Sequence, residues 1–172
     1  SILQASKRVN DVYFRAGAAS LSGSTTNRII TKKLNAAVHQ SGTAPVTYDP
    51  VTGRFIFNVS GWYEIGCQAY FRVEATNPNP ADYGTLLFAS CNIEFSGGGG
   101  RYVNREQQLS SALLPYLSYA GNLTIPIMHF NAGEWVAPNI QGGYVEAGSV
   151  GTNINLTGLS DAFFNIVLVE AD

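Results

Sequence analysis

The chain has 172 residues, which suits one domain with a substantial hydrophobic core. Only 13 % of the residues are charged and the formal net charge is -2, so the sequence lacks the basic surface that nucleic-acid binding needs. No apolar run approaches the ~20 residues of a membrane-spanning helix, so membrane insertion is not expected.

The first clear elements surround a turn at residues 49–53, "DPVTG". Pro50 presets the φ angle of a turn's second position, and Gly53 can adopt the positive φ that closes it. A strand-like run follows, in which every second residue is apolar: Phe55, Phe57 and Val59. Gly61 then marks the next turn, so the segment predicts closely spaced antiparallel hairpins.

Period-two alternation continues along the chain. The run at 63–73 places six apolar residues on one face, namely Tyr63, Ile65, Cys67, Ala69, Phe71 and Val73. The run at 87–95 does the same with Leu87, Ala89, Cys91, Ile93 and Phe95. The best helix candidate, residues 104–117, has no apolar stripe of helical period and runs into Pro115. The pattern therefore predicts an all-β sandwich or barrel of short antiparallel strands.

Some of these strands carry apolar residues on both faces. The run at 123–130 sets Leu123, Ile125 and Ile127 against Met128 and Phe130, and the run at 162–169 sets Phe164, Ile166 and Leu168 against Phe163, Val167 and Val169. A sandwich buries only one face of each sheet, so a second subunit is expected to cover the other. The residues expected at that interface are Trp62, Tyr70, Leu123, Ile125, Ile127, Phe163 and Val167.

Cys67 and Cys91 are the only cysteines. Both lie on the apolar side of a predicted strand, where a buried thiol behaves as a small hydrophobic group. The sequence leaves two alternatives open, a pair of buried free thiols or a disulfide.

Residues 48–66, "YDPVTGRFIFNVSGWYEIG", resemble the signature of the globular head domain of the complement C-one-q and tumour necrosis factor superfamily. In that family a "YDP-TG-F" turn precedes a strand and then Gly and Tyr. Residues 11–24 resemble the opening strand, "NAGEW" at 131–135 the late "GE-V" turn, and "FNIVL" at 164–168 the closing "F-G-L" strand. Ile166 stands where the family usually has Gly.

The resemblance implies a jelly roll of about ten antiparallel strands that assembles as a homotrimer. Its inner sheet would line the threefold axis and contain the strands that begin near Trp62, Leu123 and Ala162. Residues 1–10 are then expected to be a stalk remnant or base segment, and residues 11–172 a single head domain.

No constellation for catalysis is visible. The two histidines, His39 and His129, are isolated in sequence, and no nucleophile-elbow, zinc-protease or phosphate-loop motif occurs. We therefore expect a protein that is not an enzyme and needs no cofactor or metal. Asp82 and Asp161 in predicted loops could contribute oxygen ligands to calcium, but the sequence contains no EF-hand-type cluster.

Strand parity places three predicted loops at the end opposite the termini: residues 74–84, 115–122 and 142–161. Their tyrosines and polar side chains are typical of recognition loops, because a phenol offers apolar area and a hydrogen bond at modest entropic cost. The candidate ligand-binding residues are Asn79, Asp82, Tyr83, Tyr116, Tyr119, Tyr144 and Asn153. The alternative is that these tyrosines pack the loops against the sandwich or seal the trimer.

The sequence thus favours a trimeric recognition head at the tip of a virion fibre or spike, of bacteriophage type, that binds a host-cell surface receptor or glycan. The low charge and the abundance of Gly, Asn, Ser and Thr favour a location on the virion surface. One alternative is an extracellular, secreted complement-like head on a collagen-like stalk. Another is a structural capsid or decoration protein.

Overall fold

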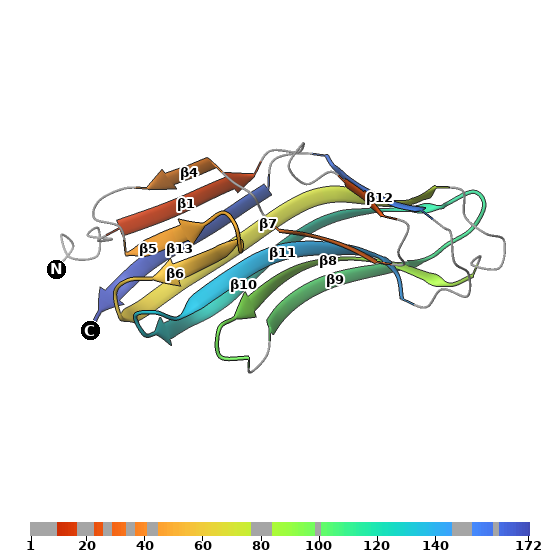
Figure 1. Cartoon of the computed structure of the whole chain (residues 1–172). Coiled ribbons are helices and arrows are strands. Elements are labelled where there is room, and N and C mark those ends of the chain that lie inside the picture. The colour runs from red at the N-terminus through yellow and green to blue at the C-terminus, as the bar shows by residue number, and fades with distance from the viewer. Residues whose placement is uncertain are drawn as a thin grey trace.

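The computed structural model describes the backbone of residues 10–16, 23–25, 29–33, 37–40, 45–76, 84–98, 101–145, 153–159 and 162–172. Side chains are described for residues 45–76, 84–98, 104–145, 153–159 and 164–172. Within these ranges the chain forms strands and turns only, and the strands build two packed antiparallel sheets (Figure 1). The predicted all-β sandwich is confirmed.

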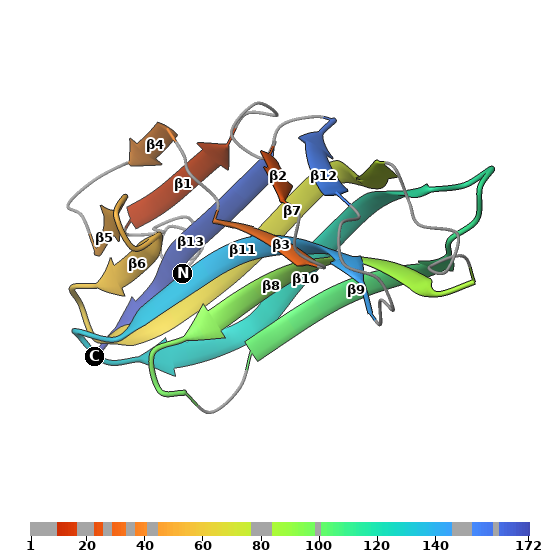
Figure 2. The same ribbon diagram turned by 45° about the vertical axis from the view of Figure 1, so that its right-hand side comes forward.

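Sheet A is built around β7, the longest strand. β10 pairs with one edge of β7; β13 and then β12 pair with successive halves of the other edge. β1 and β4 extend the sheet beyond β13, and β2 extends it beyond β12, as the rotated view in Figure 2 shows. The strands of sheet A are β1 (Asn10–Ala16), β2 (Gly23–Thr25), β4 (Ala37–Gln40), β7 (Gly61–Thr76), β10 (Tyr116–Phe130), β12 (Asn153–Gly158) and β13 (Ala162–Ala171).

Sheet B runs in the order β5-β6-β11-β8-β9, with β3 also paired to β11. Its strands are β3 (Ile29–Lys33), β5 (Val46–Asp49), β6 (Arg54–Phe57), β8 (Leu86–Phe95), β9 (Arg101–Leu109) and β11 (Trp135–Tyr144). The chain crosses from sheet A to sheet B between β7 and β8, back between β9 and β10, and over again between β10 and β11. Repeated crossing between two antiparallel sheets is the connectivity of a jelly roll.

The described strands define two opposite ends of the molecule, as strand parity predicts. The start of β1 pairs with the end of β13, since Asn10 lies opposite Leu168, so both strands reach the end that we call the base. The turn at residues 131–134 also lies at the base, between β10 and β11. β7, β9 and β11 all finish at the opposite end, which we call the distal end (Figure 1).

The predicted turn at residues 49–53 joins β5 to β6. Gly53 adopts a φ of 72°, and its N–H donates to the carbonyl oxygen of Asp49 at 2.8 Å. The Asp49 carboxylate accepts from the Thr52 hydroxyl at 2.6 Å and from the Val51 N–H at 2.9 Å. These bonds, the Thr52 hydroxyl first, lower the pKa of Asp49 because they favour the charged carboxylate.

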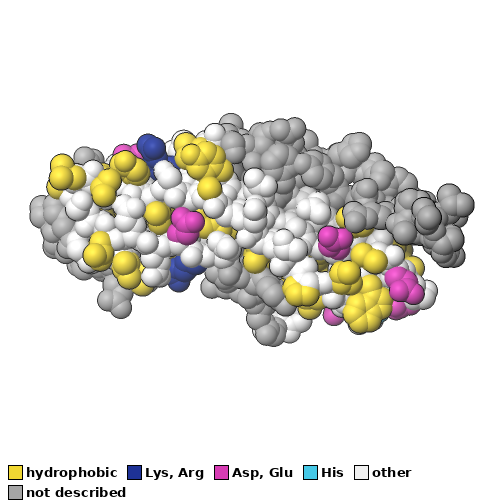
Figure 3. Space-filling model, turned by 180° about the vertical axis from the view of Figure 1, so that it is seen from behind, with side chains coloured by type: hydrophobic (Ala, Val, Ile, Leu, Met, Phe, Trp, Pro, Cys, Tyr) yellow, Lys and Arg dark blue, Asp and Glu magenta, His cyan; other side chains and the backbone are white. Residues whose placement is uncertain are grey.

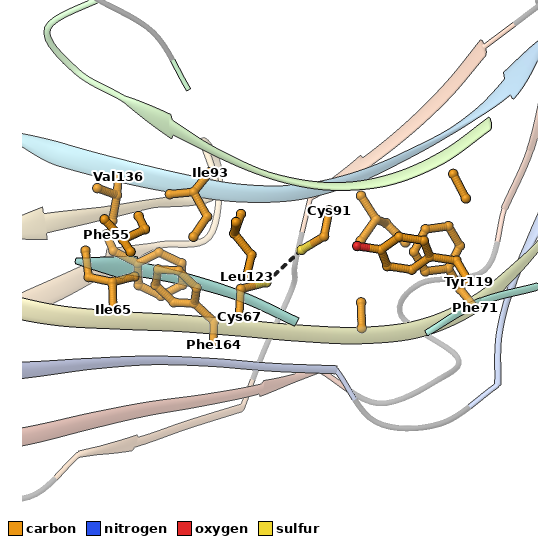
Figure 4. Close-up of a cluster of buried hydrophobic side chains, with 14 of the residues drawn as sticks. Phe55, Ile65, Cys67, Phe71, Cys91, Ile93, Tyr119, Leu123, Val136 and Phe164 are labelled. Atoms are coloured by element: carbon orange, nitrogen blue, oxygen red, sulfur yellow. Dashed lines mark hydrogen bonds between the residues drawn. The ribbon is translucent and has the colours of Figure 1, made fainter. Parts of the chain in front are cut away.

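The core lies between the two sheets and contains the side chains that the alternation predicted. All six apolar residues on one face of residues 63–73 are buried. Leu87, Ala89, Cys91 and Ile93 face them from β8, while Phe95 is only partly buried. Phe55 packs on Phe164 with ring centroids 4.7 Å apart, which ties β6 to β13 across the core (Figure 4).

The prediction for residues 123–130 was wrong in one respect. Leu123 and Ile125 point into the core, and after them Met128 and Phe130 do so, because a β-bulge shifts the register of β10 against β7 between residues 125 and 128. An extra residue in one strand reverses the alternation, and Pro126, which has no N–H to donate, is suited to such a position. The core-facing residues of β10 are therefore odd-numbered up to Ile125 and even-numbered from Met128 onward.

Candidate functional site

The distal end carries a pocket between the ends of β8, β9 and β11. Its volume is about 430 Å³, and it is lined by Gly84, Thr85, Leu86, Leu109 and Val145. Backbone hydrogen bonds hold its rim: the Gly84 N–H donates to Ser110, the Ser110 N–H to Thr85 and the Val145 N–H to Leu86, each at 2.9 Å. The pocket is thus formed by the sheet edges themselves. No pattern in the sequence predicted this pocket.

Exposed leucines occur at the same end of the molecule. Leu109 is 62 % exposed, and in the connection from β9 to β10 Leu113 is 90 % and Leu114 45 % exposed. In the sequence, Leu113 and Leu114 belong to the segment 104–117, which lacks a helical period, and three leucines in a polar segment are the signal for an apolar surface there. We call Leu109, Leu113 and Leu114 the distal leucines.

Tyr116 and Asn153 are the candidate binding residues that the structure describes near the distal end with some exposure. Tyr116 begins β10 and is half-buried, with the guanidinium carbon of Arg72 4.6 Å from its ring centroid. Asn153 begins β12 and is also half-buried; its carbonyl oxygen accepts from the Thr76 hydroxyl at 3.3 Å. Asn79, Asp82 and Tyr83 lie outside the described residues, as does Asp161.

Tyr119 and Tyr144 do not present their rings to solvent, so their assignment to exposed recognition loops was wrong. They are 0 % and 1 % exposed, because each occupies a core-facing position of a strand. The Tyr119 hydroxyl donates to the Oδ1 of Asn104 at 2.9 Å, and burial raises the pKa of this phenol. Tyr119 and Tyr144 instead fit the alternative prediction that these tyrosines pack against the sandwich.

The predicted loop boundaries change accordingly. Residues 116–122 belong to β10, whereas the connection before it spans residues 110–115. The long loop of residues 142–161 is interrupted by the end of β11 and by β12. The signal that was missed is the alternation Leu117, Tyr119, Leu123, Ile125, which continues the apolar face of β10 toward the distal end.

A second surface is the outer face of sheet A, which is turned away from sheet B. Its described apolar side chains include Trp62, Tyr70 and Ile127, which are 45 %, 40 % and 54 % exposed. Near the base the Trp62 ring meets the imidazole of His129 edge-on, with centroids 5.3 Å apart. The Nε2 of His129 is hydrogen-bonded to the Asp172 carboxylate, whose oxygens lie 2.9 and 3.0 Å away.

Uncharged side chains fill the middle of this face. A groove of about 370 Å³ between β7 and β10 is lined by Gln68, Ala69, Tyr70, Ala120, Gly121 and Asn122. Figure 3 views the molecule from behind and shows apolar side chains toward both ends, with acidic and basic groups beside them and a largely uncharged middle among the described residues. The charged side chains of β7 that face outward, Glu64, Arg72 and Glu74, lie on either side of this uncharged stretch.

The residues expected at a subunit interface are distributed as follows. Trp62, Tyr70 and Ile127 are exposed, the last because the bulge turns it outward. Val167 alternates with core residues of β13 and so lies on the outer face, yet it is only 5 % exposed. Leu123 and Ile125 belong to the core of the chain itself, so their interface assignment was wrong. The Phe163 side chain lies outside the described residues.

Among the described residues, no group of three or more His, Cys, Asp or Glu side chains is arranged to hold a metal ion. In the same ranges no helix has the length and apolar character needed to span a membrane.

Comparison with known proteins gives structural neighbours and no sequence match. No protein-family model and no curated protein matches the sequence. Among solved structures, the chain is similar to the Eiger TNF from S. frugiperda, with 13 % identity, coverage of 94 % of this chain and 93 % of that one, and a TM-score of 0.49. It is also similar to murine APRIL at pH 5.0 (14 % identity, 87 % and 99 % coverage, TM-score 0.43). The globular domain of the zebrafish complement 1qA protein has 12 % identity, 94 % and 98 % coverage and a TM-score of 0.44.

Proposed function

We propose that the chain is a non-enzymatic recognition head that assembles as a homotrimer through the outer face of sheet A. The observation that carries this proposal is the exposure of Trp62, Tyr70 and Ile127 on one sheet face whose middle is uncharged. Fully burying a large apolar side chain contributes roughly 1.5–3 kcal/mol, so association of this face is favourable. The threefold arrangement follows the resemblance of residues 48–66 to trimeric globular heads.

The distal end is the proposed recognition surface. The end of β13 lies at the base, so a shaft attached there would direct the distal leucines and the adjacent 430 Å³ pocket outward. A concave site lined by the side chains of Leu86, Leu109 and Val145 is suited to a partner that offers apolar area. The proposed partner is a receptor on the host-cell surface, either a protein or a glycan.

The host system that fits the composition best is a virion fibre or spike, of bacteriophage type. Support for it comes from the chain's low content of charged residues, 13 %, and from its eighteen glycines in a polar, uncharged background. In this role the head is carried on the virion surface.

Assembly is tested with Trp62→Glu, which places a carboxylate on the outer face of sheet A. Multi-angle light scattering should give the mass of three chains for the wild type and of one chain for the variant. Val51→Glu is the matched control, since Val51 is 85 % exposed in the β5–β6 turn and lies on sheet B. A wild-type monomer, or a Trp62→Glu trimer, would overturn the proposed interface.

Recognition is tested separately, by measuring the binding of the fluorescently labelled trimer to candidate host cells and to a glycan array. Saturable binding that the unlabelled trimer competes away supports a recognition head. A stable trimer that binds neither, and that instead co-assembles with the other proteins of a virion shell, would favour the structural capsid or decoration role.

A further inference from the structure

The two cysteines meet in the middle of the core, one from each sheet. Cys67 lies on β7 of sheet A and Cys91 on β8 of sheet B, and their sulfur atoms are 2.9 Å apart (Figure 4). Cys67 is 4 % exposed and Cys91 0 %. As the chain contains no other cysteine, neither has a competing partner within it.

The neighbours of the pair fix its position. In sheet A, Cys67 lies between Leu123 of β10 and Phe164 of β13. In sheet B, Cys91 is paired with Ile140 of β11 on one side. Both thiols therefore lie on central strands, each hydrogen-bonded to a neighbouring strand on both sides. This pairing fixes the positions of the two Cα atoms relative to each other.

The distance is short enough for a bond to form with small side-chain rotations. A disulfide holds its sulfur atoms about 2.05 Å apart, so two sulfurs separated by 2.9 Å need to approach by less than about 1 Å. Inter-sheet disulfides across the core of a β-sandwich are known to be compatible with sheet packing, as in immunoglobulin domains.

We propose that Cys67 and Cys91 form an inter-sheet disulfide when the chain folds in the presence of a disulfide oxidant such as oxidised glutathione. One cysteine thiolate attacks the oxidant and releases one glutathione thiolate, which leaves a mixed disulfide. The second cysteine then attacks the mixed disulfide at the sulfur of the first, forming the Cys67–Cys91 bond and releasing the second glutathione. The two cysteines lose two protons and two electrons, and the oxidant gains them as two molecules of reduced glutathione.

The bond is expected to form as the two sheets come together, before the burial of the two thiols is complete. In the folded chain a hydrogen bond with Cys91 and burial both raise the pKa of the Cys67 thiol, so its reactive thiolate is scarce. The burial of both sulfurs also keeps a bulky oxidant or reductant away from them. Each redox form, once folded, is thus kinetically trapped.

The bond would enclose the connection from β7 to β8, which lies at the distal end. It would fix the two strands that carry this connection to each other. Closing a loop between residues 24 positions apart also restricts the unfolded chain, so the oxidised form should be the more stable one. This inference depends on the fold alone and not on the proposed recognition role.

The test compares two refolded preparations of the full chain, one made with oxidised and reduced glutathione and one with dithiothreitol. Each is alkylated in denaturant and digested with trypsin. The glutathione preparation should contain peptide 55–72 linked to peptide 73–101, and the link should disappear on reduction. Its melting temperature should exceed that of the reduced preparation by about 5–10 °C.

Two further measurements make the result decisive. Native oxidised protein should resist dithiothreitol until denaturant is added, and non-reducing electrophoresis should show a single chain. Alkylation of both cysteines in a glutathione preparation with native near-ultraviolet circular dichroism would overturn the proposal. Disulfide-linked chain dimers would overturn it as well, because they would assign the reactive thiols to different molecules.

Discussion

Tyr119 and Gly121 illustrate how single residues fit into this core. The Tyr119 side chain extends along β10 over Gly121, and its hydroxyl reaches Asn104 on β9 of the facing sheet B. A Cβ atom at position 121 would collide with the Tyr119 ring and hydroxyl. The glycine therefore leaves room for a buried phenol that is hydrogen-bonded, which avoids the cost of an unpaired polar group in the core.

Gly121→Ala should destabilise the chain, since the new methyl group occupies space already taken by Tyr119. Overpacking of this kind costs about 1–3 kcal/mol, to be read from urea unfolding. Gly97→Ala is the control, because a Cβ at that exposed turn position meets no atom within 4 Å. Equal stability of the two variants would contradict the close approach of Tyr119 to position 121.

Tyr63 should make the fold sensitive to high pH. Its hydroxyl donates to the Val59 carbonyl oxygen at 2.6 Å, and burial raises its pKa from 10.0 to about 12. Between these values the unfolded chain releases a proton that the folded chain retains, so stability is full below pH 10 and falls as the pH rises to about 12. Tyr63→Phe should lessen that fall in a series of thermal melts. If the melting temperature of the variant falls with pH as steeply as that of the wild type, the loss of stability at high pH comes from other groups.

At the scale of the element, the strands were more predictable than the irregularities within them. Alternation in residues 63–73 and 87–95 identified the core face of β7 and β8. With a period of two, a shift by one residue would move all the apolar side chains to the solvent face, so only one assignment buries them. The bulge in β10 was not predicted, since one inserted residue reverses the parity without changing the composition. Pro126 was the available sign, as proline in a strand is confined to edges and bulges.

The bulge can be tested with a pair of substitutions two residues apart. Ile125→Asn buries an unpaired amide in the core, since Ile125 is 1 % exposed, and should cost several kcal/mol or prevent folding. Ile127→Asn places the same amide on the outer face of sheet A and should leave the fold intact. Soluble yield and near-ultraviolet circular dichroism report the difference. Equal damage at both positions would restore the regular alternation that the sequence alone suggested.

For the whole molecule, the sequence correctly predicted an antiparallel sandwich, the presence of β7, β10 and β13 in one sheet, and which connections share the distal end. It did not predict which tyrosines are exposed. Their exposure depends on where each strand ends, and the strand propensity of the residues changes only gradually at the end of a strand. β12 shows the difficulty: it lies in a segment rich in Asn, Thr and Gly, yet Ile154 and Leu156 from it are buried. Of the tyrosines expected at the distal surface, Tyr119 and Tyr144 are buried, and the exposed distal leucines were not predicted.

The distal leucines provide the last prediction. Leu113→Ser with Leu114→Ser removes exposed apolar area from the proposed recognition surface without touching the core or the outer face of sheet A. Because side chains that are 90 % and 45 % exposed contribute little to folding, the trimer mass and melting temperature should stay within error of the wild type. Binding to host cells should weaken at least tenfold, which corresponds to about 1.4 kcal/mol. Val51→Ser, an equally exposed change away from the distal end, should bind like the wild type, and unchanged binding by the double variant would move the site away from the distal leucines.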